Sequence, residues 1–443
     1  MKPQFLIGSL CADNGKALLS WGLMRALSRR GLNVQAYECG ADLSDTVARK
    51  VAVGNVAVNL DTWYSSHPHV QYLYNTYGET ADVCVLDSMG GLFDGFRKWQ
   101  GSGAEMAQVL SVPVVLAVNA RTATYSLAPM LHGFRHFRPG VKIAGVIFYQ
   151  VHTPSQYGFL REVCADAGVE SLGYLLYSEK LRLPARYSAM TSGMKAELDA
   201  VIQRAAEMME KTVDLDKLLN LTTRIFPCAY SLPYTSETEP RIRSFHKRIR
   251  IAVASDPAFH FLYRQNLDFL AGRGELTFFS PVYGNDLPQA DLIYLPGGYP
   301  ELFARQLHRW KRQLQQLRDF AEAGGRVLAE GGGIALLART VAARQGGTPY
   351  GMSELLPLDV AVNEGRLCAG YRKVDFAGLT LKGYECRYLE IASPHEAADL
   401  TFSYMANLKG VETPGSFICR YKNVIAVTAH CYWENTDILD WWR

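Results

Sequence analysis

The chain has 443 residues, of which 48% are hydrophobic and 20% charged, and its formal net charge is +3. This length allows two or three domains with their own hydrophobic cores, and the composition excludes a disordered chain. The small net charge gives no signature of a nucleic-acid or membrane-surface partner, and no apolar run reaches the roughly 18 residues that span a bilayer.

The nine cysteines are scattered along the chain, and no two of them form a C-x-x-C pair. This pattern indicates neither a disulfide framework nor a zinc site. It fits a reducing compartment, so we expect a cytoplasmic protein.

In the first half of the chain, short apolar runs alternate with helix-length amphipathic segments. A helix is predicted over Leu18–Arg30. Strands are predicted at Phe5–Ile7, Asn33–Tyr37, Val83–Leu86, Val112–Val118 and Ile143–Phe148. Continuous apolar strands separated by helices are typical of a parallel sheet covered on both faces.

The stretch from residue 179 to residue 248 is polar, with a helical run over Met194–Leu218, and we predict that it connects two domains. Strand–helix alternation restarts at Ile249–Ala254. Later strands are predicted at Leu276–Phe279, Leu292–Leu295 and Val327–Ala329. Antiparallel strands are expected over Ser416–Val427. These patterns predict an α/β protein with one domain over residues 1–245 and a second over residues 246–443.

The layout strand, loop, Gly15-Lys16, helix is that of a phosphate-binding P-loop, in which backbone N–H groups and a helix N-terminus hold phosphates. The motif is incomplete, because Ala17 stands where a magnesium-binding hydroxyl belongs. Asp13 would also place a carboxylate against phosphate oxygens. Taken alone, the segment favours an ordinary strand–helix turn over a P-loop.

Several colinear segments together resemble the cobyrinate a,c-diamide synthase family. In the first half, Glu38–Asp45, Asn59–Asp61 and Asp87–Gly95 are similar to three of its motifs. In the second half, the similar segments are Ser280-Pro281, Tyr294–Leu302, Phe320–Gly325, Ala329–Gly333, Gly383–Glu385 and His430.

The resemblance implies a definite architecture and chemistry. The first domain would be P-loop-like, of the dethiobiotin-synthetase type, and would use ATP and Mg²⁺ to phosphorylate two acetate side chains of a corrin-type macrocycle. The second would be a class I glutamine amidotransferase, in which a Cys attacks glutamine, a His activates the Cys, and the released ammonia makes the amides. Both would be α/β folds with mostly parallel sheets.

This sequence departs from the family where the glutamine chemistry would occur. Gly331, directly after Glu330, occupies the nucleophile position, and glycine has no nucleophilic atom. His430 matches the base but has no thiol to deprotonate. Gly297 and Gly298, which match the family's oxyanion loop, persist. Glutamine hydrolysis by the family's route is therefore not expected.

The nucleotide side also departs from the family. Glu38 reverses the charge of a family Lys, Asn119 replaces an Asp, and Tyr149 replaces an Asn that resembles the adenine-reading residue of related folds. The surviving nucleotide-site residues are Gly15, Lys16, Asp42, Asp45 and Asp87. Asp42 and Asp87 are the candidate Mg²⁺ ligands, since carboxylates suit this ion.

Residues that would bind a large carboxylated ring are less affected. The candidates are Phe259, His260, Phe261, Tyr263, Tyr299 and Glu301. Flat rings suit a macrocycle, although the same aromatics could instead pack the domain core. The basic residues between 241 and 250 could pair with carboxylates or form a solvated linker. Trp433, Trp441 and Trp442 look exposed and could dock on the body of the protein or on a partner.

Three hypotheses follow from this sequence. The first is a family member without the parent catalysis that binds a tetrapyrrole-like carboxylated ligand or a partner protein. The second is an ATP-dependent amidoligase that uses free or channelled ammonia. The third is a structural partner of an active paralogue. The family pattern also suggests a homodimer.

Overall fold

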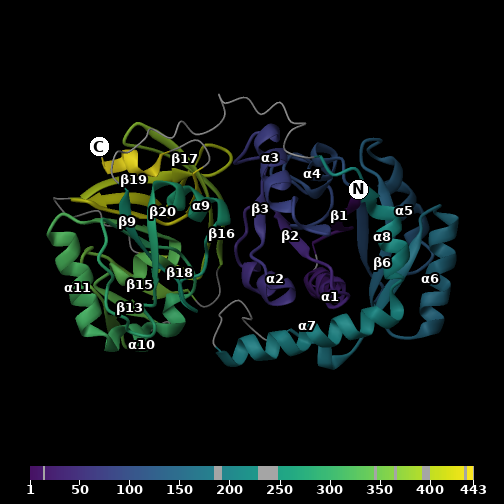
Figure 1. Cartoon of the computed structure of the whole chain (residues 1–443), viewed down its shortest axis with the longest axis horizontal. Helices are drawn as coiled ribbons and strands as arrows, with labels where there is room; N and C mark the ends of the chain where they lie inside the picture. The colour runs from purple at the N-terminus through teal and green to yellow at the C-terminus, as the bar shows by residue number, and fades with distance from the viewer. Residues whose placement is uncertain are drawn as a thin grey trace. The chain divides into compact units, whose positions relative to one another are not determined.

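The computed structural model describes residues 1–12, 15–183, 192–227, 248–343, 347–363, 367–391, 400–433 and 437–442. The chain divides into two compact units. The described residues up to 227 form unit 1, and those from 248 onward form unit 2 (Figure 1). The predicted boundary at residue 245 and the basic residues 241–247 lie outside the described residues.

Unit 1 is built on a sheet with strand order β3-β2-β4-β1-β5-β6-β7, in which all neighbours are parallel, and β8 adds an antiparallel pair with β1. Its strands are β1 Lys2–Ser9, β2 Val34–Cys39, β3 Val58–Leu60, β4 Val83–Ser88, β5 Val114–Asn119, β6 Ile143–Val151, β7 Ser171–Leu176 and β8 Thr223–Arg224. Its helices are α1 Gly15–Arg29, α2 Thr46–Val53, α3 His67–Gly78, α4 Gly103–Leu110, α5 Leu127–His136, α6 Pro154–Asp166, α7 Ser192–Thr212 and α8 Leu215–Thr222, with a 3-10 turn η1 over Glu179–Leu181. The predicted parallel sheet with covering helices is confirmed.

Local sequence explains where several of these helices begin. Thr153 accepts a hydrogen bond from the backbone N–H of Gln156 at 3.1 Å, and Pro154 follows it in the first turn of α6. Ser102 does the same for Glu105 at the start of α4. Such caps satisfy N–H groups that have no partner inside the helix. They place helix N-termini at the carboxyl edge of the sheet, where the candidate nucleotide residues lie.

Helix α7 is part of unit 1, so the prediction that this segment merely connects two domains is wrong for its described residues. Leu198, Ile202 and Ala205 are completely buried in the same core cluster as α1. A Cβ atom added to Gly22 of α1 would lie only 2.9 Å from the Cβ of Ala205, and Figure 1 shows the two helices side by side. The segment is polar in overall composition, and its one apolar face was not recognised from the sequence. Neither α7 nor any other helix in the described part of the chain is long and apolar enough to cross a membrane.

Unit 2 contains a ten-stranded mixed sheet with order β10-β9-β11-β12-β21-β20-β19-β16-β17-β22 and a small sheet with order β14-β13-β15-β18. Its strands are β9 Ile249–Ala254, β10 Gly274–Phe279, β11 Leu292–Leu295, β12 Arg326–Glu330, β13 Thr340–Ala342, β14 Tyr350–Gly351, β15 Asp359–Val362, β16 Cys368–Phe376, β17 Leu379–Arg387, β18 Leu389–Ile391, β19 Leu400–Ala406, β20 Glu412–Tyr421, β21 Val424–Val427 and β22 His430–Tyr432. Its helices are α9 Arg264–Arg273, α10 Ala304–Arg309 and α11 Lys311–Glu322, with 3-10 turns η4 Pro300–Phe303, η5 Gly331–Leu336 and η6 Ile438–Trp442. The parallel part ends at β21, and β20 pairs antiparallel with it, as predicted for Ser416–Val427.

The C-terminal tryptophans complete the core of unit 2. Trp433 and Trp441 are 1% and 0% exposed and lie in a cluster with Val427 and Cys431. The indole N–H of Trp442 donates to the carbonyl of Asn423 at 2.8 Å. The expectation that these rings are exposed is therefore wrong, and of the two alternatives they dock on the body of the protein. Burial of such large rings makes this end of the chain part of the fold.

Candidate functional site

The candidate nucleotide residues of unit 1 meet at the carboxyl edge of the parallel sheet. Glu38 and Asp87 stand near the ends of the neighbouring strands β2 and β4, and they are register partners. Lys16 lies in the first turn of α1, directly after β1, which pairs with β4 on its other side. In open α/β sheets, ligands bind at this edge near the point where the strand order reverses. The fold thus brings these predicted residues together.

Lys16 is engaged by residues of its own chain. Its ammonium group forms an ion pair with Asp87 Oδ1 and donates to the backbone carbonyl of Ser88 at 2.6 Å. The hydroxyl of Ser20, one turn further along α1, donates to the same Asp87 oxygen at 3.1 Å. Lys16 and Asp87 are 7% and 2% exposed. The positive charge that a P-loop offers to phosphate is neutralised here by a buried carboxylate.

A second buried ion pair lies beside the first. Arg49 of α2 pairs with Glu38, the residue with reversed charge, and its Nη2 atom is also 3.7 Å from Asp87 Oδ2 and 3.9 Å from Asp45 Oδ2. Arg49 and Glu38 are 2% and 4% exposed. Sequence reasoning missed Arg49, although its spacing of four residues from Asp45 on a helix was an available signal. The reversed charge at residue 38 therefore has a local partner.

The residues expected to bind Mg²⁺ do not fit the ion. Magnesium needs a near-octahedral oxygen shell at about 2.1 Å. One oxygen of Asp87 accepts from Lys16 and Ser20, and the other faces Arg49. Both Asp42 oxygens accept hydrogen bonds from Ser44, at 2.9 and 2.8 Å. No cluster of three or more potential metal ligands occurs within the described ranges.

Other nucleotide positions are used for packing. Ala17, at the place of the P-loop hydroxyl, packs against the unit 1 core, and Tyr149 is 2% exposed within that core. Gly15 begins α1, and Asn119 caps a turn by accepting from the backbone N–H of Arg121 at 3.0 Å. Asp13 lies outside the described residues.

In unit 2, the backbone makes a tight turn at the nucleophile position, where the residue is a glycine and has no side chain. Gly331 follows strand β12 with a φ of +49°, a left-handed conformation that favours glycine. A Cβ atom added there would overlap the His430 ring at Cε1 and lie 2.8 Å from its Nε2. A Cβ atom added to Gly297 would overlap the same ring. The imidazole thus fills the space in which a nucleophilic side chain would stand.

His430 is also poorly suited to act as a base at neutral pH. It is 1% exposed, and burial lowers its pKa to about 4. The nearby carboxylate of Glu385 opposes this shift, whereas His260 adds to it. The neighbouring Cys431 lies in the hydrophobic cluster with Trp433. Strand alternation places Cys431 on the face opposite His430, so its thiol does not point toward the imidazole.

Glu330 does not contact His430 through its hydrogen bonds but binds other residues. Its carboxylate accepts from the Tyr294 hydroxyl at 2.7 Å and from the backbone N–H of Cys431 at 3.2 Å. It is 1% exposed, and burial raises its pKa to about 8. A neutral carboxyl among hydrophobic residues ties β11, β12 and β22 together. The structure therefore gives Glu330 a role in joining strands.

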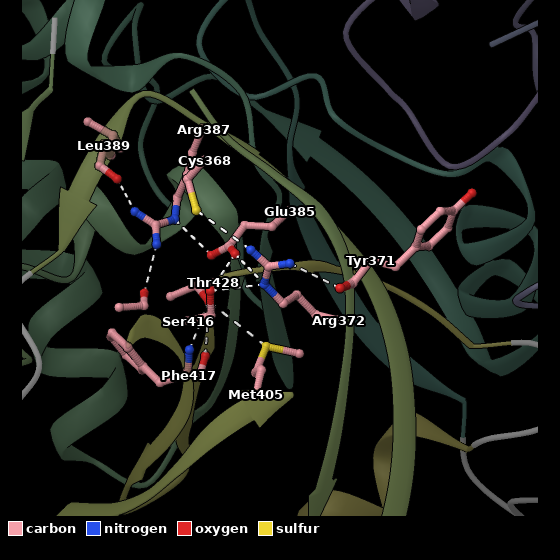
Figure 2. Close-up of polar contacts among 11 residues, drawn as sticks. Cys368, Tyr371, Arg372, Glu385, Arg387, Leu389, Met405, Ser416, Phe417 and Thr428 are labelled. Atoms are coloured by element: carbon pink, nitrogen blue, oxygen red, sulfur yellow. Dashed lines mark hydrogen bonds and ion pairs between the residues drawn. The ribbon is translucent and has the colours of Figure 1, made fainter. Parts of the chain in front are cut away.

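The carboxylate beside His430 belongs to a buried ion network (Figure 2). Glu385 of β17 is completely buried and pairs with Arg372 at 2.8 Å and with Arg387 at 3.0 Å. The Ser416 hydroxyl of β20 donates to Glu385 at 2.5 Å. Arg387 also donates to the carbonyls of Leu389 and Gly415, the latter at 2.7 Å. The sequence motif around Glu385 was recognised, but both arginines were missed. Arg372 reaches Glu385 from the neighbouring strand β16, and Arg387 lies two residues further along β17, so neither contact is evident before the strands are paired.

The predicted ring-binding residues are mostly interior. Phe259, Phe261 and Tyr263 are at most 1% exposed, and this burial favours the core-packing alternative for them. Tyr299 is 6% and Glu301 is 4% exposed, while His260 is half-buried. A row of rings nevertheless reaches the surface. The centroids of Phe261 and Tyr299 are 5.2 Å apart, and those of Tyr299 and Tyr388 are 6.2 Å apart, with Tyr388 38% exposed.

Comparisons with known proteins agree with this division. Residues 9–189 match the family model of the CobQ/CobB/MinD/ParA nucleotide binding domain, and residues 250–438 match that of the CobB/CobQ-like glutamine amidotransferase domain. The fold and its two sites thus define a nucleotide-binding domain joined to a glutamine-amidotransferase-type domain.

Full-length relatives identify the family. The chain is 35% identical over 408 residues to a hydrogenobyrinate a,c-diamide synthase of Brucella abortus, covering 90% of this chain and 91% of the relative. It is 32% identical over 454 residues to a cobyrinate a,c-diamide synthase of Dehalococcoides mccartyi, covering 98% and 96%. A cobyrinate a,c-diamide synthase of Saccharolobus solfataricus is 30% identical, with 84% and 83% covered. The chain belongs to the cobyrinate a,c-diamide synthase family, as the sequence motifs indicated.

Proposed function

We propose that this chain binds a carboxylated, tetrapyrrole-like macrocycle and does not carry out glutamine-dependent amidation of it. The observation that carries the proposal is the environment of Gly331. The nucleophile position has no side chain, and His430 occupies the space above it. Acyl transfer from glutamine requires a nucleophile and a base in hydrogen-bond reach of each other. Neither requirement is met by a glycine and a buried imidazole whose pKa is about 4.

The macrocycle part of the proposal rests on the family and on the surface aromatics. The relatives are named for hydrogenobyrinate and cobyrinate, and they match this chain over nearly their whole length. Tyr388 forms the exposed end of the ring row that runs inward through Tyr299 to Phe261. Aromatic faces suit stacking against a flat ring. We therefore assign Tyr388 as the surface contact for the macrocycle.

Spectral titration tests this function. Addition of cobyrinate or sirohydrochlorin to the purified full chain should shift the visible absorption of the ring with a saturable, micromolar dependence. After incubation with glutamine, ATP and Mg²⁺, mass spectrometry should find the ring unchanged. Absence of any spectral change with either ring would overturn the binding claim, and a ring carrying new amides would overturn the claim of no amidation.

A matched pair of variants locates the contact. Tyr388→Ala should weaken ring binding about tenfold, or about 1.4 kcal/mol, which is near the upper end of what an aromatic pair contributes. Tyr283→Ala removes an equally large ring that is 64% exposed elsewhere in unit 2, and it should leave affinity unchanged. Equal affinities for both variants and the parent chain would contradict the assignment of Tyr388.

A further inference from the structure

Four buried charged side chains at the carboxyl edge of the unit 1 sheet form two ion pairs with one another. Lys16 and Arg49 supply two positive charges, and Asp87 and Glu38 supply two negative charges. All four side chains are no more than 9% exposed. A buried charge is stable when it is paired, and these two carboxylates already have cationic partners within the chain.

The guanidinium of Arg49 lies against several carboxylates, as a bound divalent cation would. Its Nη2 atom faces three carboxylates at once, which come from β2, from β4 and from the residue preceding α2: Glu38, Asp87 and Asp45. Bridging several carboxylates from separate elements is what a bound divalent ion does in a protein. Arginine can do the same because it has five N–H donors in a fixed plane and keeps its charge at all accessible pH values.

We propose that Arg49 takes the place of a divalent cation at this edge of unit 1, so that the site binds no Mg²⁺. The inference is independent of the macrocycle and glutamine claims, which concern unit 2. It also gives the reversed charge at Glu38 a physical reason: a carboxylate at that position completes the cage around Arg49. Any phosphate-bearing ligand that reaches Lys16 would bind without a metal ion.

Metal binding by the parent chain is the direct test, with Mn²⁺ as the probe because its free form has a strong paramagnetic resonance signal. The full chain should bind no more Mn²⁺ than its Asp87→Asn variant does. Stoichiometric Mn²⁺ binding by the parent chain that Asp87→Asn abolishes would overturn the proposal. This comparison does not depend on any variant at Arg49.

Removal of the arginine should let its carboxylate partners close around a metal ion, an arrangement that they do not have while Arg49 lies between them. Arg49→Met removes the cation shared by Glu38, Asp87 and Asp45, and Asp87 keeps its ion pair with Lys16. Millimolar Mn²⁺ should then raise the melting temperature of Arg49→Met by several degrees and leave the parent chain unchanged. A folded Arg49→Met variant that Mn²⁺ does not stabilise would contradict the substitution of metal by arginine.

Arg25→Met is the matched control. Arg25 also binds α2, through the carbonyls of Val51 and Ala52, and it pairs with the half-exposed Asp199. Its loss removes a similar number of contacts from the same unit but leaves no cluster of carboxylates. Mn²⁺ should therefore not stabilise this variant, and an equal gain in both variants would show that the ion acts nonspecifically.

Discussion

Unit 1 and unit 2 differ in how each departs from the chemistry of its family. Unit 1 keeps the charged groups at the sheet edge and pairs them with one another, as Lys16 does with Asp87. Unit 2 has lost a side chain at Gly331, and the neighbouring imidazole fills the space. Paired charges can in principle be exchanged for those of a ligand, because the groups remain in place. Glycine offers no nucleophilic atom in any arrangement, so unit 2 departs from the family's residue pattern more completely than unit 1 does.

The largest effect is expected from breaking the ion network of unit 2. Glu385→Gln leaves Arg372 and Arg387 facing each other without a carboxylate, which should cost about 3–5 kcal/mol. Hydrogen exchange measured by mass spectrometry on peptides of β16 and β17 would report this loss locally. Arg250→Ala breaks an exposed pair with Asp291 and should cost far less, because solvent screens the two charges. Similar losses in the two variants would show that the buried network contributes no more than a surface pair.

The corresponding Glu-to-Gln substitution in unit 1 tests whether its buried charges are shared among more partners than those of unit 2. Glu38→Gln should cost less than Glu385→Gln, because Arg49 keeps Asp87 and Asp45 within 3.9 Å. Exchange of β2 peptides gives the corresponding measurement. A greater loss of stability in Glu38→Gln than in Glu385→Gln would mean that Arg49 depends mainly on Glu38 and does not share its charge among the three carboxylates.

The pH dependence of stability should also separate the units. The pKa of Glu330 is raised from 4.5 to about 8, so its stabilising contribution is complete below pH 4.5 and is lost as pH rises through 8. The pKa of His430 is lowered from 6.5 to about 4, so it acts in the opposite sense below pH 6.5. Between pH 6.5 and 8, unit 2 should thus lose roughly 2 kcal/mol, and Glu330→Gln should abolish this loss. The stability of unit 2 can be followed by hydrogen exchange of β12 peptides. A parent chain whose stability does not change between pH 6.5 and 8 would contradict the burial of a neutral carboxyl.

The smallest effect concerns the packing of α7 in unit 1. Gly22→Ala places a Cβ 2.9 Å from Ala205 and 3.2 Å from Met209, so unfolding should become easier by about 1 kcal/mol. Gly133→Ala on α5 meets no atom within 4 Å and should instead stabilise by about 0.5–1 kcal/mol, as alanine does in an open helix. Thermal unfolding distinguishes the two signs. Stabilisation by both substitutions would show that α7 is not packed against α1.

Much of the fold could be predicted because its signals are local. Apolar runs such as Ile249–Ala254 and Leu292–Leu295 became buried parallel strands, and the motif order identified the family. The site could be predicted only in part. The absence of a thiol at Gly331 is visible in the sequence, but the position of His430 over it depends on how β12 and β22 meet. Arg49, Arg372 and Arg387 were missed because their partners are chosen by tertiary contacts, and α7 was misassigned because its polar face dominates its composition.

Release of ammonia from glutamine tests the central claim most directly. The account predicts that the purified chain releases no ammonia above the buffer rate, with or without nucleotide. Gly331→Cys alone should not restore release, because the new Cβ would overlap the His430 ring. Saturable release of ammonia by the parent chain, abolished in His430→Ala, would contradict the account.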